Sequence, residues 1–310
     1  MIYYFNFSFT IVIKVLLLIM PVLVNVAFVT LMERKILGLS QNRLGPNKVA
    51  FNGLIQPFRD AIKLFIKQSE PNTNVNWKFF LLGPFLILIV ALFLWVVFPS
   101  SSSHSWFPLG LISLLTFLSL SVYPLLIIGW ASNRKYALIG AIRGVAQTIS
   151  YEISLGLIII VFIVYYIGLA ASSRVIYDFR LLFYWPSLAI LWIIILLAET
   201  NRTPFDFSEG ESELVSGFNV EYSATGFVLI FLREYAIIIL FSCLRVSLFC
   251  GLELFIFFSR LLGLIVSSFW FLLRATLPRY RYDLLINLAW KRYLPIVLLV
   301  TIVSTLVFML

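Results

Sequence analysis

The chain has 310 residues, of which 62% are hydrophobic and 12% are charged. Soluble domains carry roughly 25% charged residues, so this composition excludes a soluble enzyme, a secreted disulfide scaffold and a nucleic-acid-binding module. The net charge of +9 is therefore to be explained first by membrane topology. With Cys243, Cys250 and His104 as the only cysteines and histidine, the chain by itself has too few ligands for an iron–sulfur cluster, a bis-His haem or a tetrahedral zinc site.

Eight segments are apolar over about the 20 residues that a membrane-spanning helix needs. In chain order they are Phe9–Leu31, Phe79–Phe98, Phe107–Trp130, Gly144–Ala171, Phe183–Ala198, Ser223–Leu244, Leu261–Leu273 with short extensions, and Leu294–Leu310. The stretch from Val246 to Arg260, which contains Glu253, is the hardest to assign. The expected fold is an all-α integral membrane protein with about eight transmembrane helices, forming a single membrane domain over residues 1–310.

Lysine and arginine are distributed unevenly between the loops. Seventeen of the 23 lie in the loops after the first, third, fifth and seventh segments, and four lie in the opposite loops. Because cationic loops stay on the inside of the membrane, both termini are expected outside. The first segment has neither a cationic n-region nor the character of an Arg-rich transit peptide. We therefore expect insertion where the chain is made, in a bacterium or an organelle, or insertion with the first segment as the signal.

The first inside loop, residues 32–78, contains a predicted amphipathic helix over 54–68. Leu54, Phe58, Ala61 and Phe65 recur at helical spacing, and polar side chains occupy the other faces. One interpretation is a basic anchor lying in the membrane interface. The other interpretation is a site of paired charges, because the acid Asp60 stands between the cations Arg59 and Lys63.

Ionisable residues also fall inside predicted helices, where they are costly unless they face a polar interior. Glu152 follows Gln147 and Tyr151 within about two turns of Arg143, and Glu234 follows Arg233. Both glutamates are candidate proton sites. The alternative for Glu152 is a purely structural role, in which its side chain forms a hydrogen bond between packed helices.

The second inside loop, residues 199–222, is acidic on the side where cations collect. It contains one cation, Arg202, and the acids Glu199, Asp206, Glu209, Glu211, Glu213 and Glu221. Crowding of like charges raises the proton affinity of at least one member. A divalent-cation site and a solvated acidic turn are the alternatives, but EF-hand spacing is absent and we expect no metal. The third inside loop, residues 274–293, is basic and aromatic, which is typical of an interface belt.

Several of these segments together resemble the subunit 1 family of respiratory complex I, the NADH:ubiquinone oxidoreductase. The matching segments are Met32–Gly38, Gly45–Lys48, Gln56–Phe65, Ala137–Glu152, Ala198–Tyr222 and Leu277–Asp283. The resemblance implies eight transmembrane helices, inside loops that pack on a peripheral arm, and a tunnel for ubiquinone. It also implies that this chain carries no redox centre.

The resemblance assigns two groups of site residues. The quinone tunnel would be lined by Arg34, Arg43, Phe58, Asp60, Lys63, Arg202, Asp206 and Arg279. Proton coupling would use Arg143, Glu152, Glu199, Glu209, Glu211, Glu213 and Glu234. Two departures from the family pattern change the local charge: Leu44 replaces a common lysine, and Arg233 stands where a small residue is usual.

The resemblance also implies the surroundings of the chain. The chain alone would bind no cofactor; ubiquinone would be the substrate of the complex, and NADH, FMN and iron–sulfur clusters would belong to other subunits. The partners would be those subunits and membrane lipids, with no nucleic acid. We expect a multi-pass protein of the mitochondrial inner membrane, with the bacterial plasma membrane as the alternative. The rival function is an ion-translocating subunit of a related membrane-bound hydrogenase or antiporter complex that does not handle quinone, and a structural adaptor is the third.

Overall fold

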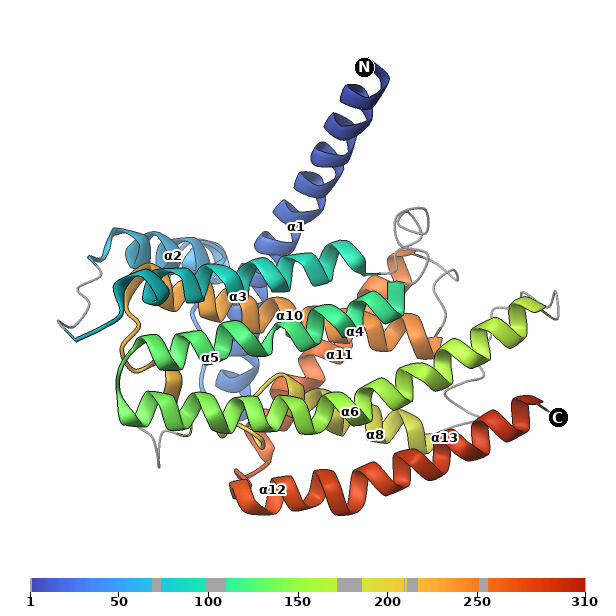
Figure 1. Ribbon diagram of the computed structural model, residues 1–310. Helices are drawn as coiled ribbons and strands as arrows, with labels where there is room; N and C mark the ends of the chain where they lie inside the picture. The colour runs from blue at the N-terminus through green and yellow to red at the C-terminus, as the bar shows by residue number, and fades with distance from the viewer. Residues whose placement is uncertain are drawn as a thin grey trace.

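The computed structural model describes residues 2–68, 74–98, 110–171, 186–208, 210, 217–250 and 256–309 (Figure 1). Within these ranges the regular elements are all helical. In chain order they are α1 (Ile2–Ser40), η1 (Phe51–Gly53), α2 (Gln56–Ile66), α3 (Trp77–Val97), α4 (Gly110–Leu120), α5 (Val122–Ala131), α6 (Lys135–Ala171), α8 (Pro186–Glu199), η2 (Gly217–Asn219), α10 (Ala224–Cys250), α11 (Ile256–Thr276), α12 (Tyr282–Leu288), η3 (Ala289–Tyr293) and α13 (Leu294–Met309).

In the part of the chain that the structure describes, each of the eight predicted membrane segments coincides with helix, which confirms the all-α membrane fold. Six stretches of the described chain are long and apolar enough to cross a membrane. The other two segments correspond to shorter apolar helices, Pro186–Glu199 and Leu262–Thr276. The predicted amphipathic helix is present as α2.

The ends of several elements differ from the sequence-based prediction. The segment 107–130 is divided into α4 and α5 at Ser121, because Pro124 lacks the N–H that would continue the ladder from α4. Helix α6 begins at Lys135, so Arg143 lies within a helix. The second half of loop 274–293 is helical too, since α12, the π-helix η3 and α13 follow one another without a break. Hydropathy marks the part of a helix that crosses lipid and misses the polar turns at its ends.

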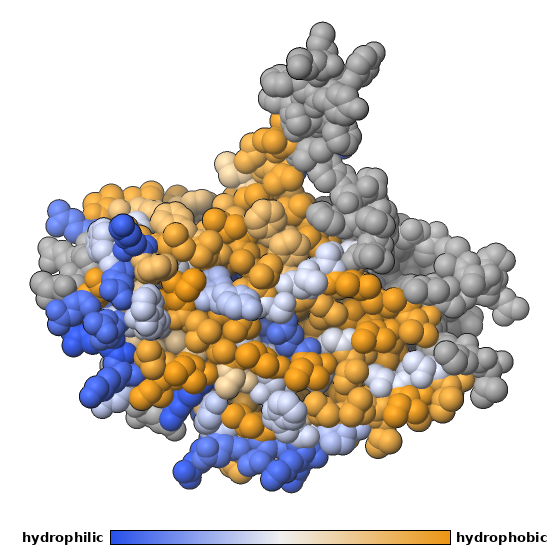
Figure 2. Space-filling view, viewed as in Figure 1, coloured by the Kyte–Doolittle hydropathy of each residue, from blue (hydrophilic) through white to orange (hydrophobic). Residues whose placement is uncertain are grey.

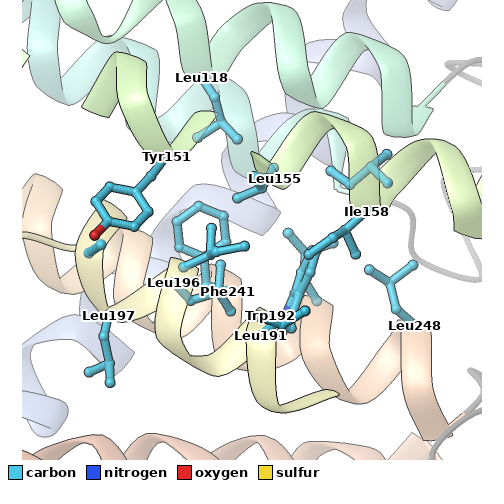
Figure 3. Close-up of a cluster of buried hydrophobic side chains, with 14 of the residues drawn as sticks. Leu118, Tyr151, Leu155, Ile158, Leu191, Trp192, Leu196, Leu197, Phe241 and Leu248 are labelled. Atoms are coloured by element: carbon cyan, nitrogen blue, oxygen red, sulfur yellow. The ribbon is translucent and has the colours of Figure 1, made fainter. Parts of the chain in front are cut away.

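The largest core lies between α6, α8 and α10. Trp192 of α8 is fully buried, and its ring meets those of Phe162 and Phe249 edge-on at centroid distances of 6.2 and 6.1 Å. Leucine and isoleucine side chains of α4, α6, α8 and α10 gather around Trp192 and Phe241 (Figure 3). This packing holds the inner ends of α6 and α8 in a fixed relation, and those ends carry Gln147, Tyr151 and Glu199.

The surface divides into an apolar body and a polar end. Hydrophobic residues cover most of the visible face, and hydrophilic ones gather where α3 begins and α5 passes into α6 (Figure 2). Backbone bonds join the inside loops: Asn76 donates to Ala131 at 3.1 Å, and Tyr280 donates to Pro204 at 3.0 Å. The ion pair of Arg134 with Glu221 at 3.2 Å joins the third-segment loop to the fifth-segment loop, so the loops after the first, third, fifth and seventh segments lie on one side of the helices, as the predicted topology requires.

The contact between α5 and α6 depends on Gly129. A Cβ atom at this position would lie 2.2 Å from the Cβ of Ala141 and 3.2 Å from the carbonyl oxygen of Ala137. Gly129→Ala is expected to push the helices apart and to lower the stability of the assembled protein by about 1–3 kcal/mol. Gly156→Ala is the matched control, because a Cβ there meets only Leu115 at 4.0 Å. The measurement is thermal unfolding of both variants, and equal midpoints would contradict this account of the packing.

Candidate functional site

Five side chains from distant parts of the chain form what we call the buried cluster. They are Glu33 at the inner end of α1, Arg202 after α8, Glu234 and Tyr235 in α10, and Arg274 in the last turn of α11. The side chains of Glu33 and Glu234 are each only 4% exposed, and that of Arg202 is 12% exposed. Charges buried to this degree are retained only where they are paired.

Glu33 is the centre of the cluster. Its carboxylate accepts a hydrogen bond from the Tyr235 hydroxyl and pairs with the guanidinium of Arg274. Arg202 approaches the same carboxylate at 3.9 Å, with Nη1 facing Oε1. Three segments from the second half of the chain therefore converge on one acid of α1.

Arg202 lies between two acids. Its Nη2 is 3.3 Å from Oε2 of Glu234, and its guanidinium lies 4.7 Å above the centroid of the Tyr235 ring. Two carboxylates and two guanidinium groups balance in charge. Because Arg202 contacts both Glu33 and Glu234, a change in charge beside it can shift its pairing from one acid to the other.

A small cavity borders the buried cluster. Its wall is formed by Glu33, Leu197, Thr200, Arg202, Ile238, Trp270, Phe271 and Arg274. The wall combines apolar and aromatic surface with a few charged donors. The cavity has room for about one water molecule, so it is the chemistry of its wall, and not its size, that resembles a site for a planar molecule with carbonyl groups.

The start of the acidic loop is held against α6. The side-chain amide of Gln147, which is fully buried, donates to the carbonyl oxygens of Ala198 and Phe205, both at 2.8 Å. On the other side of the loop, Asp206 is 3.7 Å from Arg279. These contacts place Arg202 and Asp206 relative to the helices.

A second polar region lies between α6, α8 and α10. Glu199 is 3% exposed, and its carboxylate interacts electrostatically with Glu152 and Arg233. Several polar atoms around the inner ends of α6 and α8 are buried without a hydrogen-bond partner in the described part of the chain. They are Gln147 Oε1, the Tyr151 hydroxyl, Glu199 Oε2, Asn201 Oδ1, Thr203 Oγ1 and Ser208 Oγ. This part of the interior is polar, as a path for protons requires.

A third region joins α1 to α2. Arg34 donates to Asp60 at 2.5 Å, and Gln56 donates to the other oxygen of Asp60 at 2.8 Å. The rings of Phe28 and Phe58 meet edge-on at 5.9 Å. Asp60 and Phe58 therefore both contact α1, and the apolar residues Phe58, Ile62 and Phe65 are still partly exposed on this chain.

The remaining residues singled out by sequence are distributed differently. Arg143 lies over the Tyr282 ring at 5.4 Å, Arg43 donates to Gln41 at 2.9 Å, and Lys63 is exposed. Glu209, Glu211 and Glu213 lie outside the described residues. In the part of the chain that is described, no group of three or more histidine, cysteine, aspartate or glutamate side chains is arranged to hold a metal.

Sequence reasoning assigned no role to Glu33, Tyr235 and Arg274. One signal was available for Glu33, which is an acid at the inner end of the first segment, next to Arg34 and Lys35. A lone acid among topogenic cations suggests a buried pair. Tyr235 and Arg274 carried no comparable signal, because a tyrosine next to a glutamate and an arginine at a helix end are both common.

These features define a class of protein: a multi-pass helical membrane protein with ion pairs buried between its helices and a polar interior beside them. Residues 13–305 match the profile of the NADH dehydrogenase family. The chain is 48% identical over 285 residues to NADH-ubiquinone oxidoreductase chain 1 of Anopheles gambiae, covering 91% of this chain and 90% of that protein. It is 49% identical to the Locusta migratoria protein of the same name over 93% of this chain and 92% of that protein. For the Lampetra fluviatilis protein of that name the identity is 46%, with 91% and 90% covered. The chain belongs to the NADH dehydrogenase family.

Proposed function

We propose that this chain is a core membrane subunit of a proton-pumping NADH:ubiquinone oxidoreductase of the mitochondrial inner membrane. In this proposal it forms the passage by which ubiquinone reaches its electron donor, and it transmits the effect of quinone reduction to proton-translocating parts of the complex. The relatives named above carry the enzyme's name. The electron carriers belong to other subunits of the assembly.

The observation that carries the proposal is the buried cluster together with the aromatic and aliphatic residues around it, and the small cavity beside the cluster would have to widen to admit a quinone. A quinone headgroup is planar and apolar with two carbonyl acceptors, so it needs aromatic and aliphatic surface and a few donors. Trp270 and Phe271 supply such surface, and Arg202 and Arg274 supply donors. The same arginines pair with Glu33, so occupation of the cavity bears directly on the ion pairs.

Access from the lipid would lie between α1 and α2. Arg34, Asp60 and Phe58 form the contact between these helices, and the exposed apolar residues of α2 face outward. In this role Arg43 and Lys63 would contribute cations beside the opening, and Asp206 with Arg279 would border the deeper part.

Coupling of quinone reduction to proton pumping would use the acids on α6 and in the acidic loop next to the buried cluster. Reduction of a quinone to the neutral quinol takes up two electrons and two protons, so the charge beside Arg202 would change if nearby acids supply those protons and become anionic. A shift in the pairing of Arg202 between Glu33 and Glu234 is a two-state element that can respond to that change. Arg143, Glu152 and Glu199, together with Glu209, Glu211 and Glu213 of the acidic loop, would pass the perturbation on as proton rearrangements.

The test is isolation of the native assembly in mild detergent, followed by NADH oxidation assays with and without a short-chain ubiquinone and a quinone-site inhibitor. Oxidation that depends on the quinone and is blocked by the inhibitor is expected. An assembly that moves ions or evolves hydrogen with no response to quinone would overturn the proposal. It would favour the hypothesis of an ion-translocating subunit of a hydrogenase or antiporter complex.

Glu152→Gln separates coupling from assembly. The substitution keeps the shape of a partly buried side chain and removes its ionisable proton. We expect NADH oxidation to persist while the number of protons pumped per NADH falls by at least about half, since a single proton site in series limits the path. The measurement is acidification by reconstituted vesicles with oxidation recorded in parallel. Unchanged pumping would remove Glu152 from the path.

A further inference from the structure

A cleft separate from the buried cluster opens between the start of α3 and the start of α10. It is lined by Trp77, Phe80, Leu81, Pro84 and Phe85 from α3 and by Glu221, Tyr222, Ser223, Thr225, Gly226 and Leu229 from the other side. None of these residues has a part in the function proposed above. Both helices begin on the side of the inside loops, so the cleft has one end at the membrane interface and runs into the apolar body.

The interface end of the cleft carries a pair of opposite charges. Arg134 Nε is 3.2 Å from Oε1 of Glu221, and the side chains are 53% and 15% exposed. Lys78 in the first turn of α3 is exposed at the same end. Burial raises the pKa of the Tyr222 hydroxyl, so it stays neutral and donates to the carbonyl oxygen of Ile128 at 3.4 Å. The charged side chains described at this end include the carboxylate of Glu221 and the cations of Arg134 and Lys78.

The far wall of the cleft is an apolar stripe on α3. Trp77, Leu81 and Phe85 recur every fourth residue and are 48%, 43% and 56% exposed. Residues at this spacing share one helix face, so the stripe runs along the helix. Trp77 also stacks on Phe80, which stacks on Tyr222 at a centroid distance of 4.2 Å. The aromatic stack fixes the position of the stripe beside the charged end.

Gly226 on the opposite wall has no side chain that would project into the cleft. A Cβ atom there would lie 3.0 Å from the Tyr222 ring and 3.8 Å from Pro84. A larger side chain would therefore lie against the Tyr222 ring and Pro84, on the lining of the cleft. The cleft is thus open, apolar along its length and charged with both signs at its interface end.

We propose that this cleft binds a zwitterionic phospholipid. The phosphate would lie near Arg134 and Lys78, the headgroup ammonium near the Glu221 carboxylate and the Trp77 ring, and one acyl chain along Leu81 and Phe85. Cations attract the phosphate and an aromatic face attracts an ammonium group. The Glu221 carboxylate, which pairs with Arg134, would repel a second net negative charge at this end and attract the ammonium of a zwitterionic headgroup, which favours that class of lipid.

The test uses the intact complex in lipid nanodiscs with a photoactivatable phosphatidylcholine whose diazirine lies on the acyl chain. Labelled peptides are identified by mass spectrometry, and the exposed face of α13 around Leu299, Ile302 and Leu306 serves as a reference lipid surface. We expect α3 residues 77–85 to be labelled more strongly than the reference. Excess unlabelled phosphatidylcholine should displace the label more effectively than phosphatidylglycerol.

Two variants and a control complete the experiment. Glu221→Gln should lower labelling of the cleft about threefold, as expected for loss of one partly exposed charge pair. Trp77→Ala, which removes a half-exposed ring, should lower it as well. Asp283→Asn is the matched control, because Asp283 is exposed and pairs with Arg281 at 3.4 Å away from the cleft. Labelling equal to the α13 face, absence of labelling in the cleft, or equal displacement by phosphatidylglycerol would overturn the proposal.

Discussion

Replacing Glu33 by glutamine should have the largest effect of any single change in the buried cluster. The substitution leaves the guanidinium groups of Arg202 and Arg274 facing a neutral amide in a buried site. Removal of one partner of a buried ion pair costs about 3–5 kcal/mol. We expect quinone-dependent NADH oxidation to fall by more than about tenfold, and the assembled complex to lose thermal stability.

The control for Glu33→Gln is a second variant that restores the balance of charges in the buried cluster. The double variant Glu33→Gln with Arg274→Gln removes one charge of each sign and leaves Arg202 paired with Glu234. It should recover part of the stability that the single variant loses, which a double-mutant cycle measures. NADH oxidation by a hydrophilic acceptor that does not enter the membrane should be unchanged in both. A Glu33→Gln complex with the unaltered quinone-dependent rate would show that the cluster has no part in the reaction.

Gln147→Leu should have the next largest effect. Its amide is the only described side chain that joins the carbonyl oxygens of Ala198 and Phe205, and the residues between them include Arg202. Each carbonyl keeps a backbone donor, Asn201 N–H at 3.3 Å for Ala198 and Phe207 N–H at 3.1 Å for Phe205, so loss of the two amide bonds costs about 0.5–1.5 kcal/mol each. Displacement of Arg202 should lower quinone-dependent oxidation by about tenfold, since misplacement by about 1 Å costs far more than the stability change suggests.

Thr148→Val is the matched control for this variant. Thr148 neighbours Gln147 on α6 and is buried, but its hydroxyl donates only to Val145 in the same helix at 3.0 Å. Its activity should stay near that of the unaltered complex. Equal loss in both variants would show that α6 tolerates no substitution here and that the anchoring of the loop is not the cause.

The membrane spans could be predicted because hydropathy is a local property. Each apolar segment must be helical in lipid whatever its neighbours are, since its backbone groups have no other partner there. The same reasoning explains the errors at Ser121 and over 282–293, where a proline and a polar helix extension alter the pattern. The amphipathic helix α2 was equally local, since its periodicity is contained in eleven residues.

The candidate site could be predicted only in part. The expected involvement of Arg202 and Glu234 is consistent with their contact, and the expected pairing of Asp60 is consistent with its bond to Arg34. Arg143 precedes Glu152 by about two turns in the sequence, and in the structure its guanidinium lies over the Tyr282 ring; the rotation of α6 and the course of α12 produce that contact, which the sequence did not predict. Glu33 was passed over because its partners lie far along the chain.

The sequence by itself determined that this protein is an all-α membrane protein, where its helices lie and which loops share a side, because lipid imposes those features on each segment separately. Its motifs also indicated the family. Only the tertiary structure decided that Glu33 meets Tyr235, 202 positions later, and Arg274, 241 positions later. Pairing of buried charges depends on the packing angles and rotations of several helices at once, and no local pattern in the chain encodes them.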